Sequence, residues 1–156
     1  MLVGEKNNMN KLVSIVLPVY NAGGERPKKD IASLIKAMKF RVKGYQSPLK
    51  TYLEQSIDSC LNQTYKNIEL IIVDDGSEDN TMDIVSKYRD KRIKVLRHDK
   101  NRGLPAALNT GFKYSKGDYL TWTSHDNYYL KNAIFTMMSY LIKYDFIDMI
   151  STNYIN

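Results

Sequence analysis

Short apolar runs alternate with amphipathic segments along this chain, and the alternation predicts strands separated by helices. Strands are expected near residues 13–18, 69–74, 92–97, 118–123 and 146–151. Helices are expected near 49–62, 80–89, 104–115 and 130–143, with Asp79 or Asn80 capping the second. The third strand alternates in part, which indicates either one more exposed face or a position near the sheet edge. Alternating strands and helices are typical of βαβ units, so the sequence predicts an α/β fold with a largely parallel sheet.

The second apolar run ends abruptly in two adjacent carboxylates and a glycine turn. The stretch from Leu70 to Val73 is continuously apolar, as in a strand buried on both faces of a parallel sheet, and Asp74 and Asp75 follow it. Open α/β sheets bind ligands at the carboxyl ends of their strands, so both aspartates are candidate binding residues. Asp, Gly and Ser are also common turn formers, which leaves a purely structural interpretation open.

Three further segments place polar residues at strand ends or helix starts. Residues 13–21 form an apolar run that is stopped by Pro18 and followed by a polar and aromatic tip. Residues 101–111 combine a glycine turn with the start of a helix, and Pro105 falls in the first turn, where its missing N–H costs little. Residues 117–127 form an apolar strand that ends in a carboxylate.

With these segments in this order, and with Leu61-Asn-Gln-Thr-Tyr65 before the acidic pair, the chain resembles the family-2 glycosyltransferases. The resemblance runs from about Val13 to the C-terminus. It implies a single domain over 1–156 with the GT-A fold, a Rossmann-like three-layer α/β sandwich. It also implies sugar transfer from a nucleotide diphosphate donor, UDP- or dTDP-linked, to a surface-glycan or lipid-linked acceptor, with inversion at the anomeric carbon.

The resemblance assigns a nucleotide site to six residues: Pro18, Tyr20, Asn21, Asp74, Asp75 and Arg102. The first three are expected to line the base and ribose pocket, although Tyr20 could equally be a packing residue. Asp74 is expected to accept the ring N–H of uracil or thymine, and Asp75 to orient the ribose or the turn. Arg102 is expected to contact a phosphate or the base, or to be an ordinary exposed loop residue. His98 and Asp99 are interpreted as solvated loop groups.

The resemblance also implies a Mn²⁺ or Mg²⁺ ion, which stabilises the departing diphosphate as a Lewis acid. The family's Asp-rich motif aligns with residues 123–127, where Asp126 is the retained carboxylate and the expected ligand. His125 stands where many relatives carry an aspartate. Imidazole suits Zn²⁺ or Mn²⁺ better than Mg²⁺, so His125 is a weaker metal candidate that could instead contact the phosphates.

No catalytic base can be assigned in this chain. In inverting relatives the base lies beyond the metal motif, and Asp145 and Asp148 do not match its position, so the base is expected beyond residue 156. The chain is therefore expected to be C-terminally incomplete. Two alternatives follow: a nucleotide-sugar-binding module without a complete catalytic site, and a receiver-like signalling domain, since an acidic pair at a strand end can also bind Mg²⁺.

Most of the net charge lies in one insertion, residues 22–48. This segment has seven basic residues and two acidic ones, a net of +5 against +6 for the whole chain. The pI of about 9.2 is therefore not interpreted as a nucleic-acid footprint. Apolar residues recur at helical spacing within it, which predicts a basic amphipathic helix. Peripheral contact with an anionic membrane, a flap over the donor phosphates and an extra surface helix remain alternatives.

The remaining composition indicates a globular cytoplasmic protein, with the inner face of the membrane as an alternative location. The chain is 43% hydrophobic, and neither a signal peptide nor a transmembrane run is recognised. The single cysteine, Cys60, falls in an apolar series with helical spacing and is expected to serve packing.

Overall fold

The computed structural model describes residues 10–24, 50–144 and 146–151. Only the first three positions of the 22–48 insertion are among these residues. The basic amphipathic helix expected within the insertion therefore lies outside the described residues. Four strands and four helices are described, and their bounds are β1 (Val13–Val19), α3 (Tyr52–Leu61), β2 (Ile68–Asp74), α4 (Thr81–Val85), β3 (Ile93–Arg97), α5 (Leu104–Lys113), β4 (Tyr119–Trp122) and α6 (Ala133–Lys143).

The four strands form one parallel sheet in the order β3-β2-β1-β4. This confirms the predicted α/β fold with a parallel sheet. Every residue of β1 is buried and six of the seven in β2 are, as their continuous apolar runs indicated. The partly alternating β3 lies at a sheet edge, one of the two predicted alternatives.

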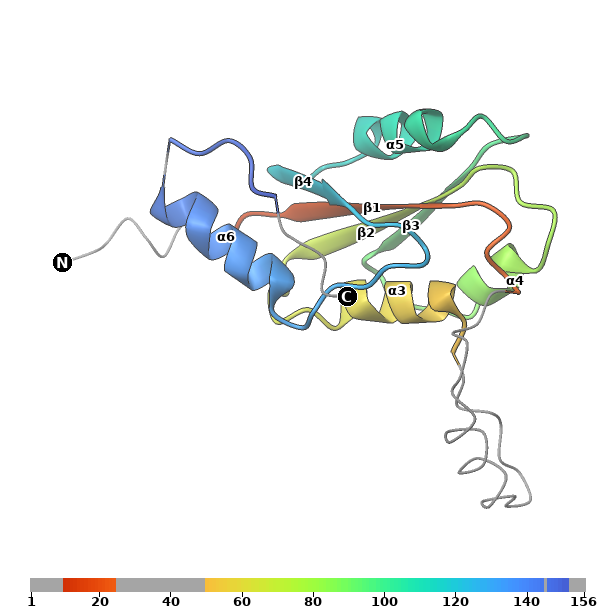
Figure 1. The fold of residues 1–156 in the computed structure, drawn as a ribbon, viewed down its shortest axis with the longest axis horizontal. Helices are drawn as coiled ribbons and strands as arrows, with labels where there is room; N and C mark the ends of the chain where they lie inside the picture. The colour runs from red at the N-terminus through yellow and green to blue at the C-terminus, as the bar shows by residue number, and fades with distance from the viewer. Residues whose placement is uncertain (1–9, 25–49, 145, 152–156) are drawn as a thin grey trace, which may run out of the picture.

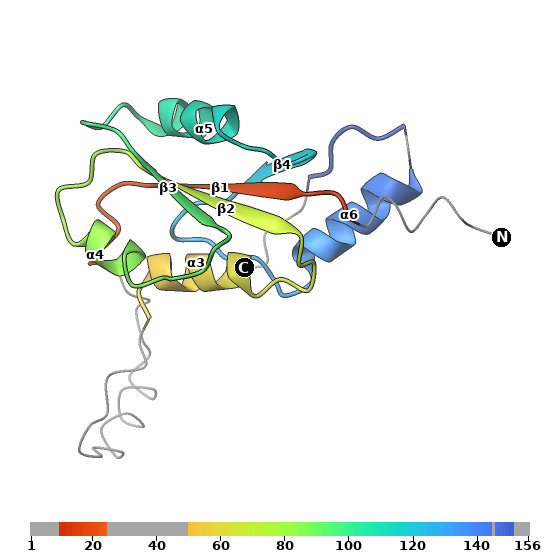
Figure 2. The same ribbon diagram turned by 180° about the vertical axis from the view of Figure 1, so that it is seen from behind.

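Helices cover both faces of the sheet and complete the predicted three layers. Helix α5 lies on one face, and α3, α4 and α6 lie on the other (Figures 1 and 2). The larger apolar core fills the space between the sheet and the three-helix layer, and a smaller one packs under α5 around Val16, Ile71, Val73 and Ala107. Cys60 belongs to the larger core, and burial raises the pKa of its thiol to about 12, so its packing role is confirmed.

Two predicted elements differ from the structure. The strand expected at 146–151 is wrong: these residues have no regular structure, and Phe146 and Met149 are 79% and 83% exposed. A strand needs a partner, and within the described residues β4 pairs only with β1, so its outer edge is unpaired. The helix expected at 80–89 ends at Val85 because the following amides bond three residues back, from Lys87 to Ile84 and from Tyr88 to Val85.

The parallel strands bring their carboxyl ends to one edge of the sheet. The loops that follow β1, β2, β3 and β4 all turn at this edge (Figure 1). We call it the carboxyl edge. Helix α3 begins near it, where Thr51 and Glu54 form a capping box that satisfies amides at the helix start. Each predicted site residue comes from one of these loops or from a strand end.

Candidate functional site

The loop after β1 is fixed to the loop after β2 by hydrogen bonds. The amide of Asn21 donates to Oγ of Ser77 at 3.0 Å, and Oδ1 of Asn21 accepts from the amide of Glu78 at 2.9 Å. Asn21 has φ +47°, a conformation that asparagine tolerates better than most residues. The Asn21 side chain is therefore engaged in holding the two loops together.

Asp79 extends this junction to the start of α4. Its carboxylate accepts from the amides of Thr81 and Gly23 at 2.9 and 2.8 Å, and the Thr81 hydroxyl in turn accepts from the amide of Ala22 at 2.7 Å. Asn80 makes no side-chain cap. Asn80 holds the N-cap position of α4, while the carboxylate of Asp79, the other predicted residue, accepts from the first helical amide, that of Thr81. Burial opposes its ionisation, but the bonds from Thr81 and Gly23 outweigh burial and hold its pKa below the usual range.

Asp75 anchors the loop that leads into α5. Its carboxylate accepts from the amide of Arg102 at 3.0 Å, from the amide of Gly103 at 2.7 Å and from Nδ1 of His98 at 2.6 Å. The side chain is 4% exposed. Burial opposes ionisation, yet these bonds together keep the pKa of Asp75 below its usual range. Asp75 thus orients a turn, which is one of the two roles expected for it.

His98 was interpreted as a solvated loop group, and this is wrong. It is 8% exposed, and its ring joins two elements. Nδ1 donates to the Asp75 carboxylate at 2.6 Å, and Nε2 forms a hydrogen bond of 2.8 Å with the Thr110 hydroxyl on α5. The sequence gives no periodic signal for this residue, because its partner Asp75 is 23 positions away.

Asp74 is fully buried at the end of β2. Oδ1 accepts from the amide of Ser77 at 3.0 Å, which is a local turn contact. Oδ2 has no hydrogen-bond partner, although Nε of Arg97 approaches it to 3.1 Å. The two groups form an ion pair, but their relative orientation is not that of a hydrogen bond. Oδ2 of Asp74 is therefore a buried acceptor that has an ion-pair partner in Arg97 and makes no hydrogen bond.

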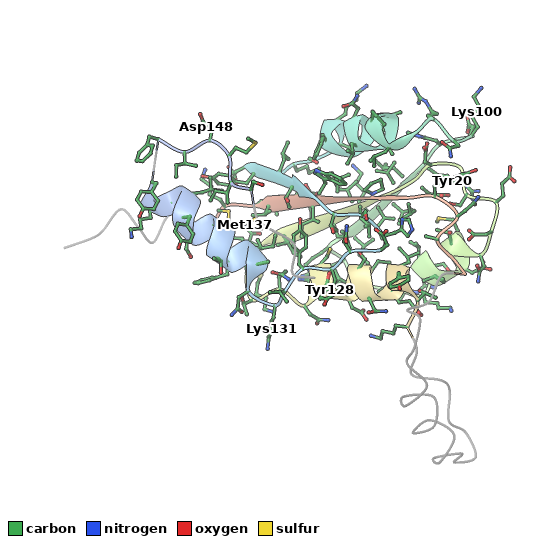
Figure 3. The ribbon with its side chains drawn as sticks, in the orientation of Figure 1. Tyr20, Lys100, Tyr128, Lys131, Met137 and Asp148 are labelled. Carbon is green, nitrogen blue, oxygen red and sulfur yellow. The ribbon has the colours of Figure 1, made fainter. Side chains whose placement is uncertain are left out.

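The other predicted nucleotide residues differ in access. Tyr20 is 41% exposed, and Figure 3 places it at the carboxyl edge together with Lys100. Arg102 is exposed in the neighbouring loop. Pro18 is buried within β1, two residues beyond Val16, whose carbonyl bonds the chain just past β4. Because β4 has ended there, the missing N–H of Pro18 removes no ladder bond.

The loop after β4 carries the predicted metal residues. Asp126 is exposed, and its carboxylate accepts a short hydrogen bond from the hydroxyl of Ser124. The Asn127 side chain donates to the same hydroxyl at 3.1 Å, and the Ser124 carbonyl accepts from Ser56 on α3 at 3.0 Å. His125 is partly buried in this turn. One carboxylate, a hydroxyl and an amide thus gather at the carboxyl edge.

This set of oxygen atoms fits a hard cation that the protein holds only in part. Mg²⁺ commonly takes one or two carboxylates and completes its shell with phosphate and water. In the described part of the chain, no group of three or more His, Cys, Asp or Glu side chains could enclose a metal ion. The residues of this turn therefore fit a hard cation only if most of its ligands come from elsewhere, since Asp126 is the one carboxylate among them.

A surface groove of about 740 Å³ lies beside α3 and is lined in part by Tyr128, which directly follows this turn. Its lining includes Lys50, Lys66, Tyr128 and Lys131. Figure 3 shows Tyr128 and Lys131 beside α3, away from Tyr20. The groove contains none of the predicted site residues, which come from the carboxyl edge. None of the described helices combines the length and the apolar character needed to cross a bilayer.

The family of the chain follows from comparison with known proteins. Residues 42–155, more than half of the chain, match the family model described as glycosyl transferase family 2. An uncharacterised glycosyltransferase of Rickettsia typhi is 37% identical over 146 residues, which cover 94% of this chain and 37% of that protein. The Escherichia coli UDP-Glc:alpha-D-GlcNAc-diphosphoundecaprenol beta-1,3-glucosyltransferase WfaP is 36% identical over 92 residues, covering 59% of this chain and 37% of WfaP.

Solved structures agree on the fold. The crystal structure of S. aureus TarS residues 1–349 in complex with UDP has a TM-score of 0.63 at 22% identity, covering 84% of this chain and 32% of that one. The mannosyltransferase PcManGT from Pyrobaculum calidifontis, in complex with GDP-Man and Mn²⁺, has a TM-score of 0.56 at 20% identity, covering 83% and 31%. The chain spans about 37% of the length of the first curated relatives it matches. It belongs to glycosyltransferase family 2 and has the GT-A fold, which excludes the receiver-like alternative.

Proposed function

We propose that this chain binds the nucleoside diphosphate of a sugar donor at the carboxyl edge, with a uracil or thymine base favoured. The carrying observation is the buried Oδ2 of Asp74, an acceptor at the end of β2 that makes no hydrogen bond. Uracil and thymine present a ring N–H that such an oxygen accepts. Arg97 pairs with this oxygen at 3.1 Å without hydrogen-bond geometry, so a base N–H would supply the hydrogen bond that Oδ2 lacks.

The surrounding residues have roles that match this proposal. Tyr20 offers an exposed aromatic ring to the base, and Asn21 sets the position of that ring through its bonds to the β2 loop. Pro18 is buried near the end of β1 and forms part of the strand end beneath the proposed site. Asp75 holds the backbone that carries Arg102, whose exposed guanidinium is placed to contact a phosphate. The name of the related E. coli enzyme, which includes UDP-Glc, supports a uridine donor.

The second part of the proposal is a divalent cation at Asp126. When bound, Mn²⁺ or Mg²⁺ stabilises the negative charge that gathers on the departing diphosphate. Asp126 holds one side of the ion, Ser124 orients its carboxylate, and His125 contacts the ion or the phosphates. The Mn²⁺ in the PcManGT complex supports this role at the level of a shared fold.

For the whole protein, we propose inverting sugar transfer to a glycan or lipid-linked acceptor at the cytoplasmic face of a membrane. The acceptor in the name of WfaP is a lipid diphosphate, which supports a lipid-linked substrate. The basic 22–48 segment is proposed to touch anionic lipid there. The general base that deprotonates the acceptor hydroxyl is proposed to lie beyond residue 156, as expected for inverting relatives.

Calorimetric titration tests the donor site. The chain is titrated with UDP, dTDP and GDP, each with and without Mn²⁺, and the series is repeated on Asp126→Ala. We expect UDP or dTDP to bind more tightly with Mn²⁺, and the metal-dependent gain to disappear in the variant. A folded chain that binds no nucleotide contradicts the donor site. Equal gain from Mn²⁺ in both proteins contradicts the metal assignment.

A turnover assay with UDP-sugars separates a second candidate, a nucleotide-sugar-binding module without catalysis. The observation that favours it is His125, which stands where a carboxylate is expected. Binding of UDP with no sugar released from UDP-sugars, even by the full-length protein with acceptor present, supports the module. Release of UDP with transfer supports the enzyme.

A further inference from the structure

The groove beside α3 lies between that helix and the segment that leads from the turn after β4 to α6. Polar side chains of α3 and of the residues just after it hold the two walls together. The hydroxyl of Ser59 accepts from the amide of Tyr129 at 3.0 Å, and the side chain of Gln63 donates to the Leu130 carbonyl at 2.9 Å. Gln63 also accepts from the amide of Ile134 at 3.0 Å and is 0% exposed. These bonds fix the shape of the groove before anything binds in it.

The lining of this groove is basic. It contains three exposed lysines, Lys50, Lys66 and Lys131, and one acidic residue, Asp58, so three positive charges against one negative give a net of +2. Asp58 forms an ion pair with Lys50. Lys66 donates to the carbonyl of Gln63 at 2.8 Å, and no carboxylate of the described residues pairs with Lys66 or Lys131. The groove therefore holds two ammonium groups whose charge is not balanced by the described part of the chain.

This positive charge is local. The whole chain has a net charge of +6, and the 22–48 insertion carries +5 of it, which leaves +1 for all other residues. The lysines of the groove are thus a patch on a domain that is otherwise close to neutral. Anionic groups such as phosphate are the ligands whose charge complements it.

Exposed apolar side chains adjoin these lysines. Tyr128 is 67% exposed, Leu130 is 55% exposed, and Lys131 follows directly. Figure 3 shows Tyr128 and Lys131 beside α3. A tyrosine ring is stable at the headgroup level of a bilayer, and lysine is attracted to anionic lipid. The exposed Leu130 contributes nothing to binding of a small soluble anion, whereas a bilayer buries it, so charge and apolar exposure together indicate a membrane.

We propose that the groove beside α3, with the exposed Tyr128 and Leu130 next to it, docks on an anionic membrane. Lipid phosphates enter the groove and contact Lys66 and Lys131, while Tyr128 and Leu130 enter the headgroup layer. The inference rests on the membrane location in the proposed function and adds to it a surface of the folded domain. This surface is separate from the basic 22–48 segment and from the residues of the donor site.

The position of this surface suits an acceptor that is attached to lipid. Tyr128 follows Asp126 by two residues, so the chain between them spans at most about 7 Å. The basic 22–48 segment ends two positions before Lys50, which also lines the groove. Docking through the groove therefore brings the turn after β4 close to the lipid surface. A lipid-linked acceptor hydroxyl can then reach the donor at the carboxyl edge without leaving the membrane.

Vesicle binding tests this surface. The full chain is sedimented with vesicles of phosphatidylcholine alone and of phosphatidylcholine with phosphatidylglycerol. Lys66→Gln with Lys131→Gln is expected to weaken binding to the anionic vesicles about tenfold or more, since each lysine near an anionic surface contributes about fivefold in affinity. The charge-matched control is Lys113→Gln with Lys116→Gln, two exposed lysines in the last turn of α5 and just after it. Helix α5 covers the opposite face of the sheet from α3, so the control should change binding by about twofold or less, because salt screens distant charges.

Two further variants separate charge from apolar contact. Lys66→Arg with Lys131→Arg keeps both charges and is expected to bind the anionic vesicles within about twofold of the unmodified chain. Tyr128→Ser is expected to weaken binding several-fold at low and at high salt, because it removes an apolar contact. The lysine-to-glutamine pair in the groove is instead expected to reduce the salt dependence of binding.

The results separate this surface from the donor site. Equal weakening by the groove pair and the control pair overturns the inference, and so does unchanged affinity of the groove pair. If soluble glycerol 3-phosphate displaces the chain from anionic vesicles more than sodium chloride of the same ionic strength does, the groove takes a small anion and membrane docking is overturned. If the unmodified chain does not bind anionic vesicles, the inference and the proposed membrane location fail together. UDP titration without vesicles still decides the donor site by itself, and the groove pair should bind UDP as the unmodified chain does.

Discussion

The loops after β1, β2 and β3 and the loop after β4 meet at the same edge of the sheet, but they are built differently. In the first group, Asp75 and Asp79 accept bonds from backbone amides of neighbouring loops, and Asp74 from the amide of its own turn. In the loop after β4, Asp126 is exposed and is bonded to the nearby Ser124 hydroxyl. The carboxylates of Asp75 and Asp79 therefore shape the protein, while Asp126 and one oxygen of Asp74 are those proposed to meet an ion or a ligand.

The difference teaches that an aspartate at a strand end is not by itself a ligand-binding residue. Asp75 has its carboxylate occupied by three donors before any substrate arrives. Asp126 keeps its charge facing solvent, where removal should affect binding more than folding. The predictions below test this division, beginning with the largest expected effect.

Replacing Asp75 should damage the fold most. Asp75→Ala leaves the buried His98 ring and the Arg102 amide without their acceptor, so at about 1–3 kcal/mol for each group we expect a loss of about 3–5 kcal/mol in the free energy of unfolding. Urea denaturation measures it. Asp99→Ala is the control, because Asp99 is exposed nearby, and it should change stability by less than about 0.5 kcal/mol. Equal effects of the two substitutions would contradict the anchoring role.

Gly76 tests the same region through its backbone. It has φ +77°, and an added Cβ would lie 2.6 Å from the backbone carbon of Lys100. Gly76→Ala should therefore cost at least about 1–3 kcal/mol from strain alone, measured by urea denaturation. Gly24→Ala is a matched control, since nothing lies within 4 Å of its added Cβ. A Gly76→Ala variant as stable as Gly24→Ala would mean that the turn can relax.

Acid should weaken the anchored loops through Asp75 and Asp79. Both pKa values are lowered by folding, so their stabilisation is fully present above the unfolded pKa of about 4 and is lost as pH falls through the folded pKa. Stability from these groups should be constant between about pH 6 and 8 and fall below about pH 4. The stability difference between the unmodified chain and Asp79→Asn should be larger at pH 7 than at pH 3. A difference that is the same at both pH values would contradict this linkage.

Asp126 should have the smallest effect on the fold. Asp126→Ala is expected to change the free energy of unfolding by less than about 0.5 kcal/mol, as for other exposed positions, while abolishing the metal-dependent part of UDP binding. Asp148→Ala is a matched control, an exposed aspartate at the opposite end of the molecule from Tyr20 (Figure 3). It should alter neither quantity. Strong destabilisation by Asp126→Ala would place Asp126 among the anchoring carboxylates.

The sequence predicted what depends on local burial and missed what depends on distant partners. The apolar runs of β1 and β2 are buried on both faces, so their composition alone identified them. The run at 146–151 has similar composition but no strand beside it, and it stays irregular. His98 and Arg97 have partners on β2, more than 20 positions away, and no local pattern marks such pairs. The single signal was their place at a strand end, next to the acidic pair.

In the 98–103 loop, buried contacts hold the backbone frame, and other side chains form the exposed surface. Asp75 and His98 hold the backbone from inside, and Gly111 of α5 sits so close to Val16 that an added Cβ would lie 2.3 Å from it. Lys100 and Arg102 are exposed on that frame. Substitutions at these two positions can therefore accumulate without disturbing the core. In evolution or in protein engineering, this loop is a place where donor preference can change while the sheet beneath it stays the same.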